Sequence, residues 1–422
     1  MIFFCKLGIQ GLAVKTKVII LWLLLVTTIQ PVLSQTQYPS SIIQFDFCST
    51  PLQFTFDKAQ LQSFQLPLSE ESIQAFYTSV NNEYYHPIVS ALKAYKEKYK
   101  PDDWLFYQLI RKTAQYISPK ADDYLRYTLY KWFLLTQTGY DAFLAQSGTR
   151  LLFYVRCDED IYNIPTRINN NKQYVCLNYH DYAEINFLKE RFTPINVPEA
   201  AAEKVFSYKI RKLPEFSPLD YQEKDLHFTY NDNDYHFKVK LNPQVITLFT
   251  NYPTVDYESQ LNIPLSKETY QSLIPLLRKN VRRMNTKNGV DYLMRFTRYA
   301  FLFETDSENF GSEKRLSPEQ TLFYEQSDCE DRVALFFYLV KEIYNLPMIV
   351  LAYPKHVTIA VQFDKPHGKS ILYNGNKYSV CEPTPQKEDL PIGSLLASLR
   401  KSPYEVVYQY TPHPTTTSSS LK

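Results

Sequence analysis

The residues best suited to chemistry lie in one short segment, Ser327–Phe337, where a cysteine stands among acidic residues. From Cys329 onward the apolar residues recur at helical spacing, which predicts an amphipathic helix. Ser327 or Asp328 can cap its start, so Cys329 is expected in the first turn. The N–H groups and the positive end of the helix dipole there favour a thiolate. The segment therefore predicts a nucleophilic cysteine.

A histidine and a glutamate follow at the ends of two expected strands. His356 begins the strand 356–361, and Glu382 ends the strand 378–382. The dipeptide Asn374-Gly375 predicts a tight hairpin turn between the strands on either side of it. A helix start, a strand start and a strand end can converge at one edge of a small antiparallel sheet. They would bring together a nucleophile, a general base and an orienting carboxylate, which is the logic of a thiol triad.

These residues resemble the transglutaminase-like superfamily. The resemblance covers about residues 265–395 and is carried by Asp328-Cys329-Glu330-Asp331, Lys355-His356-Val357, Glu382-Pro383-Thr384 and Pro391-Ile392-Gly393. It implies a papain-like core in which a helix carries the nucleophile Cys329, and an adjacent sheet carries the base His356 and the third member Glu382. The family usually has Asp in the third position, so Glu382 departs from the pattern and its extra methylene changes the reach.

The function that follows is an exported thiol hydrolase, a peptidase or amidase that cleaves peptide or isopeptide amides through an acyl-enzyme. Tyr324 and Gln326 lie close before the cysteine and are candidate oxyanion donors beside the Cys329 N–H. The alternative is a non-catalytic protein-binding or scaffolding protein built on two such folds. Faster reaction of Cys329 with iodoacetamide than of the other thiols would favour the enzyme.

Two parts of the chain resemble each other in sequence. Pro67–Ser72 matches Pro264–Thr269, and Asn171–Cys176 matches Asn376–Cys381. The agreement favours a diverged internal duplication over chance similarity between two helix–hairpin units. In the first copy the positions equivalent to the triad are Asp123, Arg150 and Leu177, which offer no thiol chemistry.

The chain of 422 residues is long enough for two to three domains. The expected fold class is α+β, with two transglutaminase-like (papain-like) domains of helices and antiparallel sheet and an intervening β-sandwich-like segment. The expected divisions are a signal peptide at 1–34, an N-terminal β segment with a degenerate transglutaminase-like domain at 35–190, a β-rich linking domain at 191–263, the catalytic domain at 264–411 and a disordered, Thr- and Ser-rich tail at 412–422.

The N-terminal leader predicts export. Three lysines precede the apolar run Val18–Val26, and Val32-Leu33-Ser34 offers a cleavage site before Gln35, as in secretory signal peptides. The mature protein is then expected to be periplasmic or extracellular with no membrane span, and a retained anchor is the alternative. Beyond the leader stand five cysteines, an odd number that leaves at least one free thiol or an intermolecular bond: Cys48, Cys157, Cys176, Cys329 and Cys381.

Composition excludes several classes of function. Only 9 glycines occur, and neither the dinucleotide-binding nor the P-loop glycine pattern is present. The net charge of +2 gives no field suited to nucleic acid. The seven histidines and the cysteines show no zinc-type spacing, so neither a metal nor a cofactor is expected. The expected partner is a peptide or protein substrate, and the oligomeric state stays open.

Overall fold

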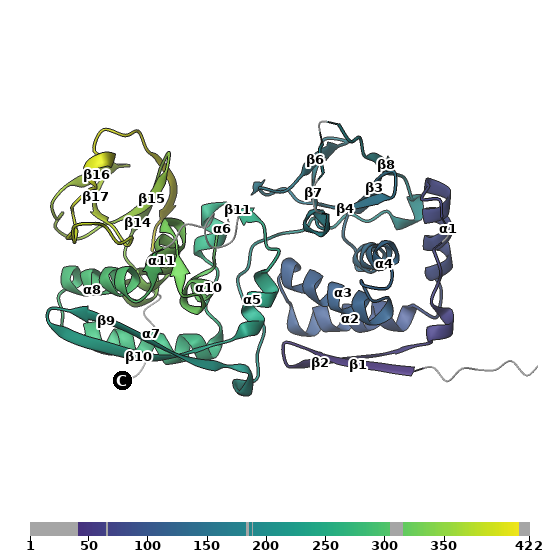
Figure 1. Ribbon diagram of the computed structural model, residues 1–422, viewed down its shortest axis with the longest axis horizontal. Helices are drawn as coiled ribbons and strands as arrows, with labels where there is room; N and C mark the ends of the chain where they lie inside the picture. Colours follow the sequence, from purple (N-terminus) through teal and green to yellow (C-terminus); the bar gives the residue numbers. More distant parts are fainter. Residues whose placement is uncertain (1–40, 65, 183–184, 188, 304–314, 413–422) are drawn as a thin grey trace, which may run out of the picture. The chain divides into compact units, whose positions relative to one another are not determined.

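The computed structural model describes residues 41–64, 66–182, 185–187, 189–303 and 315–412. The predicted signal peptide and all but the first residue of the predicted tail lie outside these residues. Within them the chain is α+β, with helices packed against antiparallel sheets (Figure 1). The expected fold class is therefore confirmed at this coarse level.

The first half of the chain begins with a hairpin, continues with four helices and ends in a sheet. Its elements are β1 (Ser41–Phe47), β2 (Thr50–Phe56), α1 (Glu70–Val80), α2 (His86–Tyr99), α3 (Asp103–Ile117), α4 (Tyr124–Gln137), β3 (Ala142–Ser147), β4 (Arg150–Arg156), β5 (Ile161–Tyr162), β6 (Thr166–Asn169), β7 (Lys172–Cys176) and β8 (Thr193–Ile195).

The second half repeats this plan with more short elements between the helices. Its elements are β9 (Gln222–Tyr230), β10 (Asn233–Leu241), α5 (Pro243–Phe249), β11 (Thr254–Val255), α6 (Tyr257–Leu261), α7 (Lys267–Val281), α8 (Thr286–Tyr299), β12 (Leu302–Phe303), α10 (Pro318–Phe323), β13 (Gln326–Ser327), α11 (Cys329–Tyr344), β14 (Met348–Tyr353), β15 (His356–Val361), β16 (Ser370–Tyr373), β17 (Asn376–Cys381) and β18 (Glu405–Tyr410).

The two five-stranded sheets have the same topology. The first has the order β6-β7-β4-β3-β8 and the second the order β16-β17-β15-β14-β18, and all neighbours within each sheet are antiparallel. In both sheets the strand that follows the last α-helix of its half, α4 or α11, pairs with the next strand through a short turn. This is the arrangement that an internal duplication would produce.

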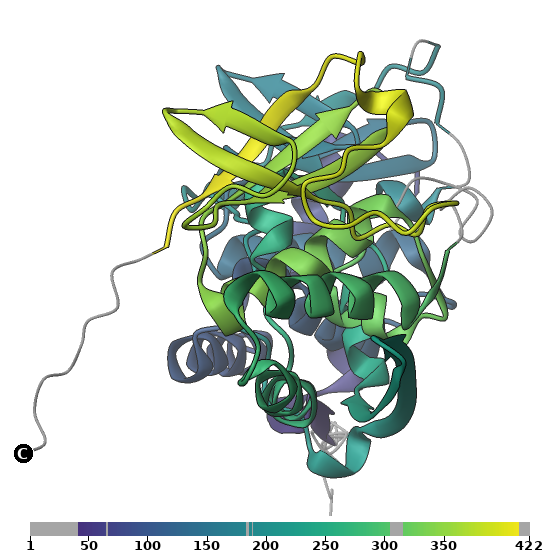
Figure 2. The same ribbon diagram turned by 90° about the vertical axis from the view of Figure 1, so that its left-hand side faces the viewer.

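In the second half, helices lie between a hairpin and the sheet. Figures 1 and 2 show the sheet above α8 and α11, with α7 and the β9–β10 hairpin below them. The helix α11 is buried on all sides from Asp331 to Val340, as expected for a helix at the centre of a core. The helix packs against β15, the strand that begins with His356.

The turn between β16 and β17 shows how the chain sets the register of this sheet. Asn374 and Gly375 both have positive φ, 45° and 77°, as the tight hairpin turn requires. The register Tyr373↔Asn376 then fixes where β17 ends. The hairpin predicted from this dipeptide is confirmed, and it determines the position of the residue after Cys381.

The expectation of a β-sandwich-like segment at 191–263 is wrong for the residues that the structure describes. The long strands of this segment, β9 and β10, form a two-stranded hairpin, and α5 and α6 follow it. The buried residues alternate along both strands, so only one face of the hairpin is apolar and it packs on α7 and α8. The other face is polar and exposed, which leaves nothing for a second sheet to cover.

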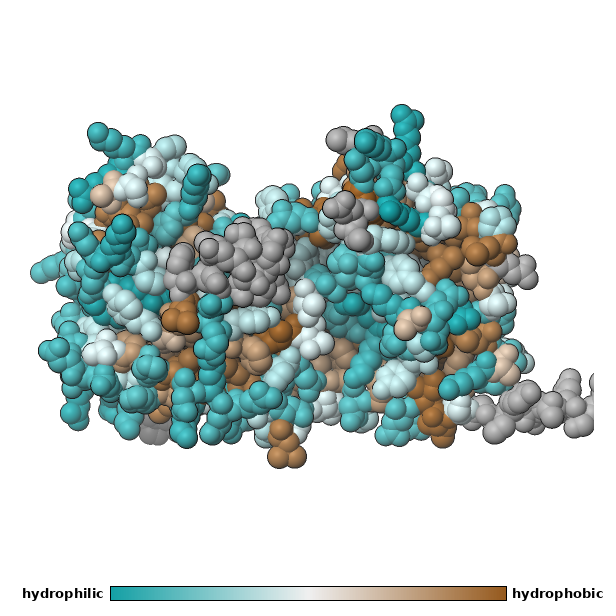
Figure 3. Space-filling view, in the orientation of Figure 1, coloured by the Kyte–Doolittle hydropathy of each residue, from teal (hydrophilic) through white to brown (hydrophobic). Residues whose placement is uncertain are grey.

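Among the described residues, no helix has the length and apolarity needed to cross a membrane. On the face shown in Figure 3, hydrophilic residues predominate and apolar residues occur in separate groups.

The hairpin supplies a direct test of the core of the second half. Phe228 contacts the rings of Tyr292 and Phe296 edge-on, at centroid distances of 5.0 and 5.7 Å. We expect Phe228→Ala to lower the free energy of unfolding by about 3–5 kcal/mol, because it opens a cavity in a close-packed core. The measurement is denaturant unfolding of the purified protein.

The neighbouring residue provides the control. His227 lies on the exposed face of the same strand. The free energy of unfolding of His227→Ala should therefore stay within about 0.5 kcal/mol of that of the unmodified protein. Equal effects of the two changes would contradict the packing of this hairpin on the helices.

Candidate active site

The start of α11 is fixed by a reciprocal pair of aspartates. The Asp328 side chain accepts a hydrogen bond from the Asp331 N–H at 3.1 Å, and the Asp331 side chain accepts one from the Asp328 N–H at 3.4 Å. This capping box fixes the N-terminus of the helix, with Asp328 as its N-cap and Cys329 as its first residue. The predicted position of Cys329 in the first turn is confirmed.

His356 and Glu382 are brought together by the sheet. His356 is the first residue of β15, and Glu382 directly follows β17. Their side chains meet with 2.8 Å between His356 Nε2 and Glu382 Oε2. The other carboxylate oxygen of Glu382 accepts a hydrogen bond from the Thr384 N–H at 3.0 Å. The glutamate thus reaches the imidazole despite its extra methylene, and both of its oxygens are occupied.

The Cys329 thiol is half-buried, and α11, which it begins, packs against β15, the strand that begins with His356. The backbone of Val357, the residue after His356, and the carboxylate of Glu382 both influence the pKa of this thiol. Burial raises the pKa of Cys329 to about 12, and the negative charges of Asp328, Glu330 and Glu382 act in the same direction. The expected stabilisation of a thiolate at the helix start is outweighed by these effects. The resting thiol is therefore neutral.

Two buried arginines, Arg332 and Arg298, link the helix that carries Cys329 to the backbone of Glu382. Arg332, one turn after Cys329, donates to the carbonyl oxygens of Thr297 and Arg298 at 2.8 and 2.9 Å. It also donates to those of Phe301, Leu302 and Ser327. Burial lowers the pKa of Arg332 to about 10, which still leaves it charged at neutral pH.

Arg298 continues this connection to the sheet. Its guanidinium donates to the carbonyl oxygen of Glu382 and, at 3.1 Å, to that of Leu390, and it pairs with Asp389. The helix that carries the cysteine thus holds the end of α8, and α8 holds the end of β17. Sequence reasoning missed both arginines, although a charged residue in the apolar face of α11 was a usable signal for Arg332.

The two acidic residues that follow Cys329 are held by partners from other parts of the chain. Glu330 pairs with Arg315 and accepts a hydrogen bond from the Tyr257 hydroxyl at 3.0 Å. Asp331 is buried and accepts from the Leu316 N–H at 2.8 Å. Each side chain therefore has its own buried or half-buried partner.

The segment Pro391-Ile392-Gly393 lies on the sheet beside β17. The Gly393 N–H donates to the carbonyl oxygen of Val380, and the Gly393 carbonyl accepts from the Lys369 N–H. Gly393 has a φ of 88°, and a Cβ there would stand 2.2 Å from the carbonyl oxygen of His367. Only glycine fits this close crossing.

The two oxyanion candidates lie just before α11. Gln326 is in β13, which pairs with β12, and Tyr324 ends α10, where its ring contacts Phe323 edge-on at 5.9 Å. Burial raises the pKa of Tyr324. Their role as donors to an oxyanion stays a prediction.

The first half has no triad at the corresponding place. Asp123 is the N-cap of α4, as Asp328 is of α11, so Tyr124 and not Asp123 corresponds to Cys329. Arg150 begins β4 as His356 begins β15, but it pairs with Glu190 at 2.7 Å. Leu177 follows β7 as Glu382 follows β17, and it is buried in the core.

An aromatic and ionic cluster occupies the start of α4. The Tyr124 hydroxyl accepts from the Asn178 amide at 2.9 Å and donates to Asp181 at 3.0 Å. Asp181 also pairs with the buried Lys131 at 3.6 Å and with Lys120. The place that corresponds to the thiol is therefore filled by a tyrosine and its partners.

The five cysteines in the described part of the chain are free thiols. Burial raises the pKa of Cys48, Cys157 and Cys176 to about 12 and that of Cys381 further. Cys381 is buried in the core, as predicted. Among the same residues, no group of three or more His, Cys, Asp or Glu side chains is placed to hold a metal ion.

Comparison of the chain with family models, curated proteins and solved structures found no match.

The arginine connection can be tested by stability. We expect Arg298→Met to lower the free energy of unfolding by about 2–5 kcal/mol, because it leaves the buried carbonyl oxygens of Glu382 and Leu390 without a donor. Denaturant unfolding provides the measurement.

Arg295→Met is the matched control, since Arg295 lies on the same helix and pairs with the same Asp389 at the surface. Loss of this surface ion pair should lower the free energy of unfolding by about 1 kcal/mol or less. If the free energy of unfolding fell by the same small amount in both variants, Arg298 would not hold the end of β17.

Proposed function

We propose that this protein is an exported thiol hydrolase of the transglutaminase-like class, acting on peptide or isopeptide amides through Cys329, His356 and Glu382. The observation that carries the proposal is the 2.8 Å contact between His356 Nε2 and Glu382 Oε2, on a sheet whose strand β15 packs against the helix that begins with Cys329. A buried carboxylate on one ring nitrogen fixes the histidine tautomer and leaves the other nitrogen to act on a thiol.

The chemistry follows from the protonation states. With Nε2 donating to Glu382, the Nδ1 atom of His356 is the acceptor. As the neutral thiol attacks the substrate carbonyl carbon, its proton passes to Nδ1 and a tetrahedral intermediate forms. His356 then returns the proton to the leaving amine, the C–N bond breaks, and an acyl-enzyme remains. Water, deprotonated by the same histidine, releases the acid and restores the thiol.

Negative charge on the intermediate needs donors. The first N–H groups of a helix have no acceptor within the helix, so the Cys329 N–H at the start of α11 suits this role. Tyr324 and Gln326 supply side-chain donors close by in the sequence. Glu382 stabilises the imidazolium that exists between the two proton transfers.

One observation favours the second candidate, a non-catalytic binding or scaffolding protein. The pKa of Cys329 is raised to about 12, so the thiol is no more acidic than the buried structural cysteines. The first half has the same sheet topology without a triad, so the fold does not depend on one. The two experiments below separate this candidate from the enzyme.

The enzyme should react with peptide-based acyl-electrophile probes at Cys329. We expect Cys329→Ala to abolish this labelling, because the attacking sulfur is lost. Asp123→Ala and Arg150→Ala in the first half should leave the labelling rate within about threefold of the unmodified protein, since neither offers thiol chemistry. Mass spectrometry of the labelled peptides is the readout.

Labelling that persists at the same rate in Cys329→Ala would mean that another thiol reacts. A loss in Arg150→Ala as deep as in Cys329→Ala would show that the first half takes part in the reaction.

Glu382→Gln separates the two candidates by the sign of its effect. In a working triad the variant should alkylate at Cys329 several-fold more slowly near pH 7, because the imidazolium formed during attack loses its counter-charge. In an inert protein the variant should alkylate faster, because Glu382 is one of the charges that raise the pKa of Cys329. Iodoacetamide labelling across a pH series measures this.

Glu388→Gln is the matched control, since Glu388 is exposed in the loop that follows. It should leave the pH profile unchanged. Faster alkylation of Glu382→Gln would overturn the triad, and an unchanged rate would show that Glu382 is not its third member.

A further inference from the structure

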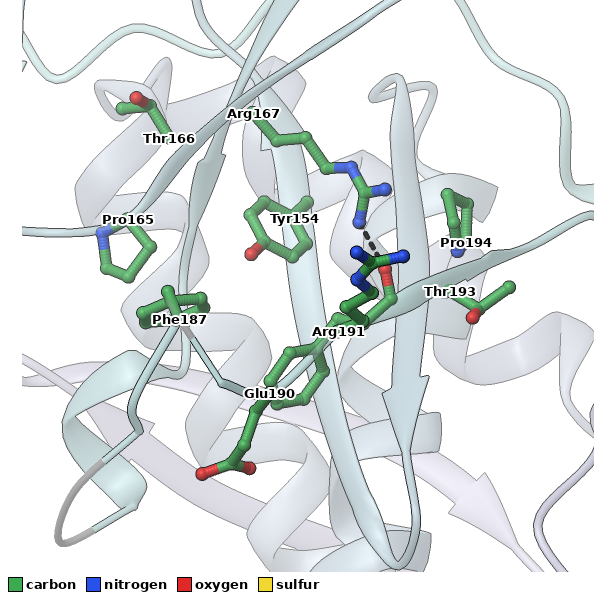
Figure 4. A pocket seen from close by; sticks show the side chains of 10 residues that line it. Tyr154, Pro165, Thr166, Arg167, Phe187, Glu190, Arg191, Thr193 and Pro194 are labelled. Atoms are coloured by element: carbon green, nitrogen blue, oxygen red, sulfur yellow. Dashed lines mark hydrogen bonds between the residues drawn. The ribbon is translucent and has the colours of Figure 1, made fainter.

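A pocket lies on the outer face of the sheet in the first half, away from the core of that half. Its volume is roughly 680 Å³, within the range of small-ligand sites. Strand β4 contributes Tyr154, strand β6 contributes Arg167, and the segment before β8 contributes Phe187, Arg191 and Phe192. Figure 4 shows the side chains of Tyr154, Arg167, Phe187 and Arg191 around one hollow.

Aromatic rings line the apolar part of this pocket. Tyr154 stacks on Phe143 with centroids 5.2 Å apart and an angle of 8° between the ring planes. Phe187 contacts Phe192 at 5.8 Å, and Phe187 is 42% exposed. Such walls suit a flat or branched apolar group, which gains by leaving water.

Two guanidinium groups share one end of the pocket. The Arg167 guanidinium donates to the carbonyl oxygen of Phe192 at 2.6 Å, which leaves most of its N–H groups for another acceptor. In the view of Figure 4, the guanidinium groups of Arg167 and Arg191 are drawn on one side of the pocket and the Glu190 carboxylate on the other, and all three residues line it. In the described part of the chain, neither arginine has a carboxylate within ion-pair distance.

Glu190 does not neutralise these charges. Its carboxylate is held by Arg150, with both oxygens 2.7 Å from one guanidinium nitrogen. Two positive charges that line one pocket without a counter-ion repel each other, and an anion bound between them offsets that repulsion. The planar donor pattern of arginine matches a carboxylate in particular.

We propose that this pocket binds the carboxylate end of a short peptide with apolar side chains. The carboxylate lies between Arg167 and Arg191, and the adjoining side chain packs on the rings of Phe187 and Phe192. An inorganic anion would satisfy the arginines but leave the aromatic walls exposed to water, so the apolar part belongs to the ligand. This binding does not depend on the triad in the second half.

The test compares acetyl-Ala-Phe, which ends in a free carboxylate, with the same peptide ending in an amide. By isothermal titration calorimetry, we expect the carboxylate form to bind at least about tenfold more tightly, because only it pairs with both guanidinium groups. Inorganic phosphate should bind more weakly than the carboxylate peptide. Equal affinities for peptide acid and amide, or no binding by the acid, would overturn the proposal.

Substitutions locate the site. Arg191→Gln changes an exposed side chain and should weaken binding of the peptide acid by about fivefold or more, and Arg167→Gln should do the same. Arg282→Gln, which changes an exposed arginine in the second half, should leave the affinity unchanged. Unchanged affinity in Arg191→Gln, or phosphate binding as tight as that of the peptide, would contradict this assignment.

Discussion

The second half depends on one buried cation. The guanidinium of Arg332 is fully buried and donates to five carbonyl oxygens, two of them in the last turn of α8 and two just after that helix. A helix that ends inside a protein leaves carbonyl groups without partners, and these must be satisfied. Arg332 satisfies them from α11, so the two helices cannot move apart without exposing a charge to the core. Arg298, which lies in the last turn of α8, donates to the carbonyl oxygen of Glu382.

The positions of the three candidate residues were within reach of sequence reasoning because each stands at an element boundary with a local signal. Asp328 and Asp331 mark a helix start, and Asn374-Gly375 marks the turn before β17. The meeting of His356 with Glu382 also followed, since antiparallel pairing carries both to one edge. The roles of these residues rest on chemistry that the fold alone does not test.

Other features could not be predicted, because they depend on distant residues. The partners of Arg298 are carbonyls at Glu382, 84 residues away, and nothing in the pattern marks a carbonyl as needing a donor. The pKa of Cys329 was misjudged because the helix start is a local feature, whereas burial is not. The strands of the linking segment were recognised, but alternation says only that one face is buried and not what covers it.

The capping residue of α4 has a consequence for protein engineering. Aligned by the caps, the thiol of a restored site in the first half belongs at position 124, one residue beyond the position that the sequence repeat suggests. A Tyr124→Cys graft would remove the hydroxyl that joins Asn178 to Asp181 and leave Lys131 facing Asp181 across a gap. A thiol site in the first half would therefore require redesign of the whole ionic cluster. The second half is the simpler scaffold for engineering altered specificity.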